Sequence, residues 1–458
     1  MLAMFLVPIV SRLAKRFRLV DTPGPRKVHQ TPIPRIGGIA FIISTLVFVL
    51  PVFFLNNDIG HSFRQSQTQL IVLLVAATFV FAVGLIDDLH PLRGYVKLLC
   101  LIAASLAICA SSEVISSISI GQWFEFETGW MSWPLTVFWI VMITVSMNFI
   151  DGLDGLAAGI AAFVCGIIFL IAVWSSQLAM SVLMLALLGS VTGFLFFNFY
   201  PAKIFMGDSG SMFLGFMIGA GSIICQTKTS TLVGLAIPFL VMGLPILDMG
   251  FLIISRSIFE RRSIFSSDRN HLHHRLMDIG LNHRTVVLVL YAVTAICTSF
   301  CVFILTSDGR WSAEFMIGGL ILLFTFFACL HSGRYDKIIL SLKNNWILAR
   351  KIKEVVRDFE TTQLRMSESK SFDTWWSTVC LMGEQMGFYS IGLWRYQEGD
   401  YKCRLNWQAS EEKTLSEKML KFSLPLNGTS CWEIRISICI DQDSSLELNG
   451  RKVMLLSR

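Results

Sequence analysis

Charged residues are scarce in this chain. They make up 15% of its 458 residues, whereas soluble globular domains carry about 25%. Hydrophobic residues reach 54%, and a purely soluble protein has no place to bury such an excess because its surface must face water. The composition therefore excludes a soluble enzyme, a disordered chain and a nucleic-acid-binding protein.

The sequence also lacks the cysteine patterns of a disulfide framework or a zinc site. Seven of the 11 cysteines lie in apolar runs, and the other four show neither a Cys-x-x-Cys motif nor a His/Cys zinc spacing. We therefore expect reduced thiols. No repeat and no low-complexity tract is present, and the apolar run at 1–10 does not have the flanks of a signal peptide.

Long apolar runs are what the sequence has instead. A membrane-spanning helix needs about 17–25 residues. Eight strong runs, two weaker runs and the short run at 1–10 predict an all-α polytopic membrane protein with about 11 transmembrane helices. The strong runs are 39–55, 70–86, 133–150, 156–174, 178–197, 232–255, 285–305 and 312–330, and the weaker ones are 98–115 and 212–225.

The composition divides the chain into three predicted regions. Residues 1–331 form the multi-pass membrane domain. Residues 332–366 form a basic amphipathic helix, which lies along the inner leaflet or serves as an ordinary linker. Residues 367–458 form a small α+β domain, with a helix at 373–387 and strands at 388–396 and 432–440, and they contain no catalytic motif.

Lysine and arginine concentrate in alternate loops, which the positive-inside rule assigns to the cytoplasm. Five aspartates fall on the same side: Asp87, Asp88, Asp151, Asp154 and Asp208. Capping of a helix explains Asp154 or Asp208 singly. The carboxylates of the adjacent pair Asp87/Asp88 repel each other and need a neutralising cation. This favours Mg²⁺, an ion that prefers carboxylate oxygens. Glycines beside these acids permit close backbone approach to a phosphate.

Three histidines lie together in the last of these loops. His271, His273 and His274 fit poorly on one helical face, so contacts with a sugar or diphosphate, with Arg275 as a charged partner, are favoured over a zinc site. Asp248 lies in an apolar run. We expect it either to pair with an arginine such as Arg256 or to have a functional role.

These motifs occur in an order that resembles a known family. The motifs are Asp-Thr-Pro-Gly-Pro-Arg-Lys-Val-His at 21–29, Thr-Pro at 31–32 with Gly-Gly at 37–38, the aspartate pair, Asn-Phe-Ile-Asp-Gly-Leu-Asp-Gly at 148–155, Phe-Met-Gly-Asp-Ser-Gly at 205–210 and His-Leu-His-His at 271–274. Over residues 11–330 the chain resembles the polyprenyl-phosphate N-acetylhexosamine-1-phosphate transferases of glycosyltransferase family 4. The histidine motif resembles the GlcNAc-1-phosphate branch more than the muramoyl-pentapeptide branch.

The resemblance implies an Mg²⁺-dependent phosphotransferase, with Mn²⁺ as an alternative ion. It would transfer N-acetylhexosamine 1-phosphate, in this branch GlcNAc 1-phosphate, from a UDP-sugar to undecaprenyl phosphate and release UMP. This is the first membrane step of a cell-surface glycan such as O antigen. The implied location is the bacterial plasma membrane, with the active site and the C-terminus in the cytoplasm. Membrane lipid is an expected partner, whereas nucleic acid is not. A homodimer is left open.

Three alternatives stay open beside this interpretation. The enzyme alternative is a phospho-N-acetylmuramoyl-pentapeptide transferase. A transporter is disfavoured because the acids lie at one interface and no repeat is visible. In the third alternative, the helices only anchor a C-terminal binding module.

The resemblance also implies residue roles. Asp87 would deprotonate or orient the lipid phosphate, and Asp88 and Asp208 would hold the metal. The other predicted catalytic residues are Asp151, Asp154, His273 and His274. The other predicted substrate-binding residues are Lys27 and Lys97 on phosphates, Asn148 on the nucleotide, Phe205 on uracil, and His271 and Arg275 on the sugar diphosphate.

Overall fold

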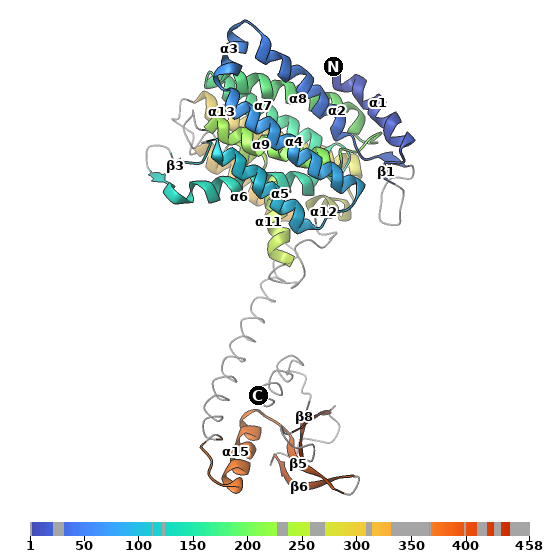
Figure 1. Cartoon of the computed structure of the whole chain (residues 1–458), viewed down its shortest axis with the longest axis vertical. Helices are drawn as coiled ribbons and strands as arrows, with labels where there is room; N and C mark the ends of the chain where they lie inside the picture. Colours follow the sequence, from blue (N-terminus) through green and yellow to red (C-terminus); the bar gives the residue numbers. More distant parts are fainter. Residues whose placement is uncertain are drawn as a thin grey trace. The chain divides into compact units, whose positions relative to one another are not determined.

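The computed structural model describes residues 2–21, 32–111, 113–120, 124–226, 237–256, 271–307, 314–330, 366, 368–397, 400–409, 419–425 and 432–439. The chain divides into two compact units, Met1–Gly333 and Arg334–Arg458, and each has its own hydrophobic core (Figure 1). The predicted linker helix at 332–366 lies outside the described residues, apart from Met366.

The first unit is a bundle of helices. Its longer helices are α1 (Leu2–Arg16), α2 (Gly38–Val49), α4 (Gln67–Leu89), α5 (Gly94–Ala110), α6 (Ser132–Ile150), α7 (Leu156–Trp174), α8 (Leu178–Asn198), α9 (Gly207–Gln226), α11 (Gly243–Ile254), α13 (His283–Thr306) and the helix Glu314–Leu330. The shorter helices are η1 (Leu50–Phe54), α3 (Asp58–Gln65), η2 (Gly129–Met131) and α12 (Leu272–Asp278). Two antiparallel strand pairs join them, β1 (Val20–Asp21) with β2 (Ile33–Pro34) and β3 (Ser117–Ile120) with β4 (Phe124–Glu127).

The helices follow the predicted apolar runs, but fewer of them are long enough to cross a bilayer. In the described part of the chain, α4, α6, α7, α8, α9 and α13 are candidate spans. The bent pair that starts with α2 and ends with α3 raises the number from six to seven. The predicted count of eleven is not reached there, because α5, α11 and the helix Glu314–Leu330 have only 10–17 residues.

The outer face of the bundle is apolar. On α4, Ile71, Val75 and Phe79 recur every four residues and are 49%, 64% and 45% exposed. The opposite face of the same helix packs into the core through Leu73 and Val80. A water-facing surface rarely carries such continuous apolar stripes. The chain is therefore a mostly helical, multi-pass membrane protein, as predicted.

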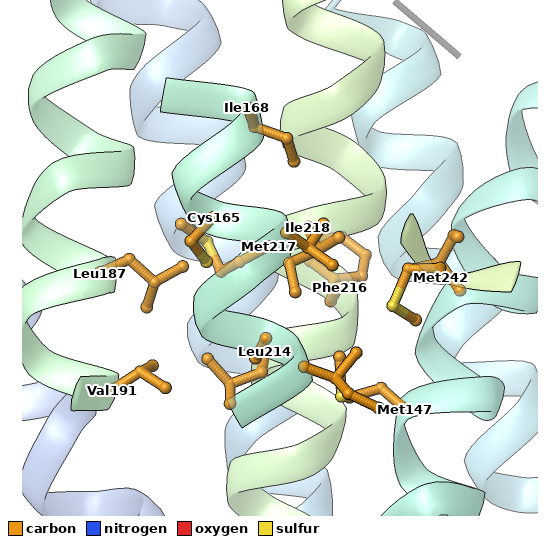
Figure 2. Packing of buried hydrophobic residues seen from close by; sticks show 14 of the residues in the cluster. Met147, Cys165, Ile168, Leu187, Val191, Leu214, Phe216, Met217, Ile218 and Met242 are labelled. Carbon is orange, nitrogen blue, oxygen red and sulfur yellow. The ribbon is translucent and has the colours of Figure 1, made fainter. Parts of the chain in front are cut away.

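Helix α9 lies in the middle of this bundle (Figure 1). It has the lowest mean hydropathy of the six candidate spans, 1.3, yet it is the most buried, because its glycines and serines let neighbouring backbones approach closely. Its large side chains fill the space between α6, α7 and α8 (Figure 2). The fully buried residues in this packing include Met147, Cys165, Ile168, Leu187, Val191, Leu214, Phe216, Met217, Ile218 and Met242.

The second unit is a small α+β fold, as predicted. Helix α15 (Phe372–Gln385) packs on an antiparallel sheet in the order β6-β5-β8-β7, formed by β6 (Asp400–Gln408), β5 (Ser390–Gln397), β8 (Trp432–Cys439) and β7 (Met419–Pro425). Helix α15 and strands β5 and β8 occupy the predicted segments, whereas β6 and β7 were not predicted. The alternating buried residues Ile434, Ile436 and Ile438 of β8 face the helix side of the sheet.

Candidate active site

Residues of two segments far apart in the sequence meet where α4 ends and α9 begins. The Lys97 ammonium, in the first turn of α5, lies 2.9 Å from Asp87 Oδ2 and 2.9 Å from Asp208 Oδ2. The other oxygen of Asp87 accepts a hydrogen bond from the backbone N–H of Leu92 at 2.6 Å. Lys97 thus holds two carboxylates together, a contact that the sequence did not predict, and its predicted role on phosphates stays a prediction.

Asp88, next to Asp87, has a different environment. Its side chain is fully buried, and its carboxylate accepts hydrogen bonds from the backbone N–H groups of Asp208 and Ser209 at 2.9 and 3.0 Å and from Ser209 Oγ at 2.7 Å. The Arg35 guanidinium lies 3.4 Å from its Oδ1. Asp88 therefore caps the N-terminus of α9, where a helix leaves N–H groups without partners. For this aspartate pair the sequence had favoured a neutralising cation over helix capping.

The close contact between α4 and α9 depends on glycine. Gly84 lies on the α4 face that meets Ser209, and a Cβ at this position would stand only 2.6 Å from the Ser209 Cα. Gly207 begins α9 with a φ of +77°, and its Cβ would collide with the Arg35 carbonyl oxygen at 2.1 Å. These two glycines allow Asp88 to reach the first N–H groups of α9.

The loop between α6 and α7 brings Asp151 to the same cluster. Its carboxylate has no hydrogen bond or ion pair within the part of the chain that the structure describes. Burial raises the pKa of Asp151 well above its usual value, and the negative charges of Asp208, Asp88 and Asp154 raise it further. Asp151 is therefore an acid whose charge nothing in the described protein balances.

Asp154 and Asn148, in and beside the same loop, hold neighbouring segments. Asp154 Oδ2 accepts a hydrogen bond from the backbone N–H of Ala202 at 2.9 Å, so it fastens the segment before α9 instead of capping α7. Asn148 Nδ2 donates to Ser211 Oγ at 2.9 Å. Both predicted site residues thus connect the α6–α7 loop with the region around the start of α9.

The histidines stack beside this loop. The His273 ring centroid lies 5.3 Å from that of His271 and 4.4 Å from that of His274. A Cβ added at Gly152 would come within 3.1 Å of His273, so the ring lies against the residue after Asp151. Burial, together with the charges of the other histidines, lowers the pKa of His273 well below its usual value, so this imidazole is neutral at pH 7.

Asp248 orients this histidine cluster. Its Oδ2 lies 3.1 Å from His271 Nδ1, and its Oδ1 accepts a hydrogen bond from the backbone N–H of Leu272 at 2.8 Å. The sequence did not predict these two contacts, and the pairing with an arginine such as Arg256 stays a prediction. An acid in an apolar run marked the position as unusual, but its partners come from the start of α12, 23 and 24 residues further along the chain.

The remaining predicted site residues are Phe205, Arg275 and Lys27. Phe205 is fastened by its backbone, whose N–H donates to the Pro34 carbonyl at 2.8 Å. The Arg275 guanidinium lies 3.4 Å from the carbonyl oxygen of Leu330 and 5.5 Å from the centre of the Phe251 ring, which ties α12 to its neighbours. Lys27 lies outside the described residues.

Two contributors to the cluster escaped prediction altogether. Arg35 balances Asp88, and the hydroxyl of Ser209 donates to the same carboxylate. Neither residue stands at a spacing that distinguishes it from the other basic and hydroxyl residues of the sequence. Arg35 lies 53 positions before Asp88, so only the packed chain shows the pair.

The acidic cluster fits a magnesium ion. Among the described residues, no three His, Cys, Asp or Glu side chains come together as a ready metal site. Mg²⁺ does not require one, since it keeps several waters and takes one or two carboxylates together with substrate phosphates. The negative charges of Asp151 and Asp208 repel each other. A cation bound by both carboxylates would offset that repulsion.

Comparison with known proteins agrees with this arrangement. Residues 70–226 match the model of glycosyl transferase family 4. The chain is 39% identical over 320 residues to a probable undecaprenyl-phosphate N-acetylglucosaminyl 1-phosphate transferase of Bacillus subtilis, which covers 70% of this chain and 86% of the relative. The protein belongs to glycosyl transferase family 4.

Two further relatives have lower identity to this chain. A decaprenyl-phosphate N-acetylglucosaminephosphotransferase of Mycobacterium leprae is 34% identical over 69% of this chain and 85% of its own length. A phospho-N-acetylmuramoyl-pentapeptide-transferase of Desulforudis audaxviator is 30% identical over 64% of this chain and 92% of its own length. The family model includes all five clustered aspartates, whereas the histidine loop lies outside the matched residues.

Proposed function

We propose that this protein transfers N-acetylglucosamine 1-phosphate from UDP-GlcNAc to undecaprenyl phosphate. An oxygen of the acceptor phosphate attacks the sugar-bearing phosphorus, the bond from this phosphorus to the bridging oxygen breaks, and UMP leaves with that oxygen. The observation that carries the proposal is the meeting of Asp87, Lys97 and Asp208 beside the unbalanced Asp151. The named activity of the Bacillus subtilis relative supports the same donor and acceptor.

The residues of the cluster have distinct proposed roles. A phosphate monoester has its second pKa near 6, so the acceptor is already largely dianionic at pH 7 and needs little help from a base. Asp87, whose two oxygens accept hydrogen bonds from Lys97 and Leu92, is better suited to orienting the reactants than to proton removal. Lys97 then offsets the phosphate charges, and phosphoryl transfer depends mainly on such positioning.

Asp208 and Asp151 are the proposed magnesium-holding residues, and Asp88 acts through the N-terminus of α9 that it caps. When bound, the ion supplies neutralisation of the diphosphate oxygens and of the leaving UMP. Asp154 and Asn148 organise the site, and Phe205, fastened to β2, is proposed to stack on uracil. Lys27 is proposed to contact phosphate.

The histidine cluster is proposed to bind the sugar diphosphate. A neutral His273 recognises hydroxyl and amide groups by hydrogen bonds, because one ring nitrogen donates and the other accepts. Asp248 fixes the orientation of His271 beside it. Together with His274 and Arg275 these groups would select the hexosamine.

The acceptor explains the membrane location. We propose that the acids face the cytoplasm of a bacterial plasma membrane, where both the lipid phosphate and a soluble UDP-sugar are accessible, and that the complete chain has about eleven spans with a cytoplasmic C-terminus. The glycolipid product of this transfer would begin a surface glycan.

Release of UMP tests the proposal. Purified protein with UDP-GlcNAc, undecaprenyl phosphate and Mg²⁺ should release UMP, and EDTA should stop the reaction until Mg²⁺ or Mn²⁺ is added. UDP-GalNAc and UDP-MurNAc-pentapeptide complete the donor panel, since the Desulforudis relative is named for the latter substrate class. Turnover with UDP-MurNAc-pentapeptide alone would establish that alternative, and no UMP from any donor would refute the transferase.

A further inference from the structure

A hollow of about 420 Å³ lies on the other side of the segment that leads into α9. Its walls come from the C-terminal half of α1, from β2, from the end of α8 and from residues 202–204. The volume lies within the roughly 300–1,000 Å³ typical of pockets that hold small molecules. Helices α1, α2 and α8 contact one another in this part of the bundle (Figure 1).

The hollow carries three positive charges. Arg12 and Lys15 of α1 and Lys203 line it, and none of the described residues of its lining is acidic. None of these three side chains has a hydrogen bond or an ion pair within the described residues. Three like charges around one concavity repel one another, so the arrangement favours an anion between them.

Apart from Ser11, the rest of the described lining is apolar. Val7, Ile33 and Ile204 are almost fully buried beneath the hollow. On the outer side of α1, Phe5 and Ile9 are 71% and 50% exposed, as expected of a helix surface that meets acyl chains. Arg12 and Lys15 therefore lie at the polar end of an apolar helix, and Lys203 lines the same hollow, which is the environment of a lipid head group.

The hollow is separate from the reacting groups. Ala202 lines it and donates its N–H to Asp154, so the two places share a wall. None of the clustered aspartates, and neither Lys97 nor any of the histidines, lines the hollow. A phosphate bound there would not meet the clustered aspartates or Lys97, which favours a bilayer phospholipid over the polyprenyl acceptor.

We propose that this hollow binds the phosphate head group of an anionic phospholipid of the surrounding bilayer, with Arg12, Lys15 and Lys203 as its ligands. The apolar floor would hold the first carbons of the lipid, and the chains would follow the outer face of α1. The proposed site does not depend on the proposed reaction, because none of the described residues that we assign to the reaction lines the hollow.

Retention of phosphatidylglycerol tests the site in the full-length protein. Protein reconstituted in phosphatidylcholine nanodiscs is titrated with phosphatidylglycerol, and bound lipid is counted by native mass spectrometry without any UDP-sugar. Replacing Arg12, Lys15 and Lys203 together by Gln should weaken retention at least about 10-fold, since each basic residue near an anionic lipid head group strengthens its binding. The matched control, Arg16→Gln, Arg18→Gln and Arg284→Gln, removes three exposed charges outside the hollow and should change retention less than about threefold.

Several outcomes would overturn the proposal. Equal loss in both triple variants would mean a diffuse surface effect, and displacement of the lipid by millimolar inorganic phosphate would mean an unspecific anion site. A raised KM for undecaprenyl phosphate in the Arg12/Lys15/Lys203 variant, measured without phosphatidylglycerol, would make the hollow part of the acceptor site. If the triple variant does not fold, Lys203→Gln alone, at an exposed position, should still weaken retention by about threefold.

Discussion

Two sides of the acidic cluster differ in how their charge is balanced. On one side, Asp88 is fully buried and accepts hydrogen bonds from the start of α9 while Arg35 lies beside it. On the other side, Asp151 has no such partner among the described residues, and Asp208 has only Lys97, which it shares with Asp87. An acid whose charge the protein itself balances belongs to the scaffold, and an acid left unbalanced marks the place for a ligand's charge.

The largest expected effect lies on the unbalanced side. Asp208→Asn should lower UMP release by roughly 10²- to 10³-fold, because loss of one electrostatic group at a phosphoryl-transfer site costs about this much. The melting temperature should change little, since the backbone N–H of Asp208 that binds Asp88 remains. Asp278→Asn, at an exposed position of α12, is the control and should behave as wild type. Wild-type turnover of the Asp208 variant would remove this residue from the mechanism.

Asp88 should give the opposite pattern. Asp88→Ala leaves the buried N–H groups of Asp208 and Ser209 without acceptors and should cost about 2–4 kcal/mol of stability. Asp88→Asn keeps one acceptor oxygen and should cost less. Thermal unfolding in detergent measures both variants. If Asp88→Ala stays as stable as wild type while turnover disappears, Asp88 acts directly on metal or substrate, as the sequence alone predicted.

The contact between α4 and α9 should be sensitive to one methyl group. Gly84→Ala places a Cβ against the Ser209 backbone and should cost about 1–3 kcal/mol through overpacking. It should also lower turnover, because it moves α9 away from Asp88. Gly166→Ala, in the middle of α7 with open space around it, is the matched control and should leave the melting temperature unchanged. Equal melting temperatures for the two variants would show that the close approach is unimportant.

The smallest expected effect comes from the C-terminal unit. Deletion of 367–458 should leave UMP release within about twofold of wild type, because that unit has its own core and the family match lies entirely in the first unit. The assay is the same UMP measurement in detergent. A loss of more than tenfold with an intact fold would make this unit part of the catalytic machinery.

The sequence predicted much of this cluster because its signals are local. Asp87 and Asp88 follow an apolar run and precede Pro91, which ends α4 as expected of the residues before a proline. The positive-inside rule put all five aspartates on the same side of the membrane, and this led to the prediction that Asp208 lies near the aspartate pair. The balance of charge at Asp88 was not predictable, because Arg35 and Ser209 lie 53 and 121 positions away and their approach depends on how α4 packs against α9.

The sequence by itself determined the membrane class and the family, and it predicted candidate site residues. Hydropathy is a sum over neighbouring residues, and motifs keep their spacing in any fold, so both can be read along the chain. Only the tertiary structure decided which acid supports α9, which histidine Asp248 orients, and that Arg12, Lys15 and Lys203 surround one hollow. Electrostatic and hydrogen-bond energies depend on distances of a few ångströms between segments far apart in the chain, and packing alone sets those distances.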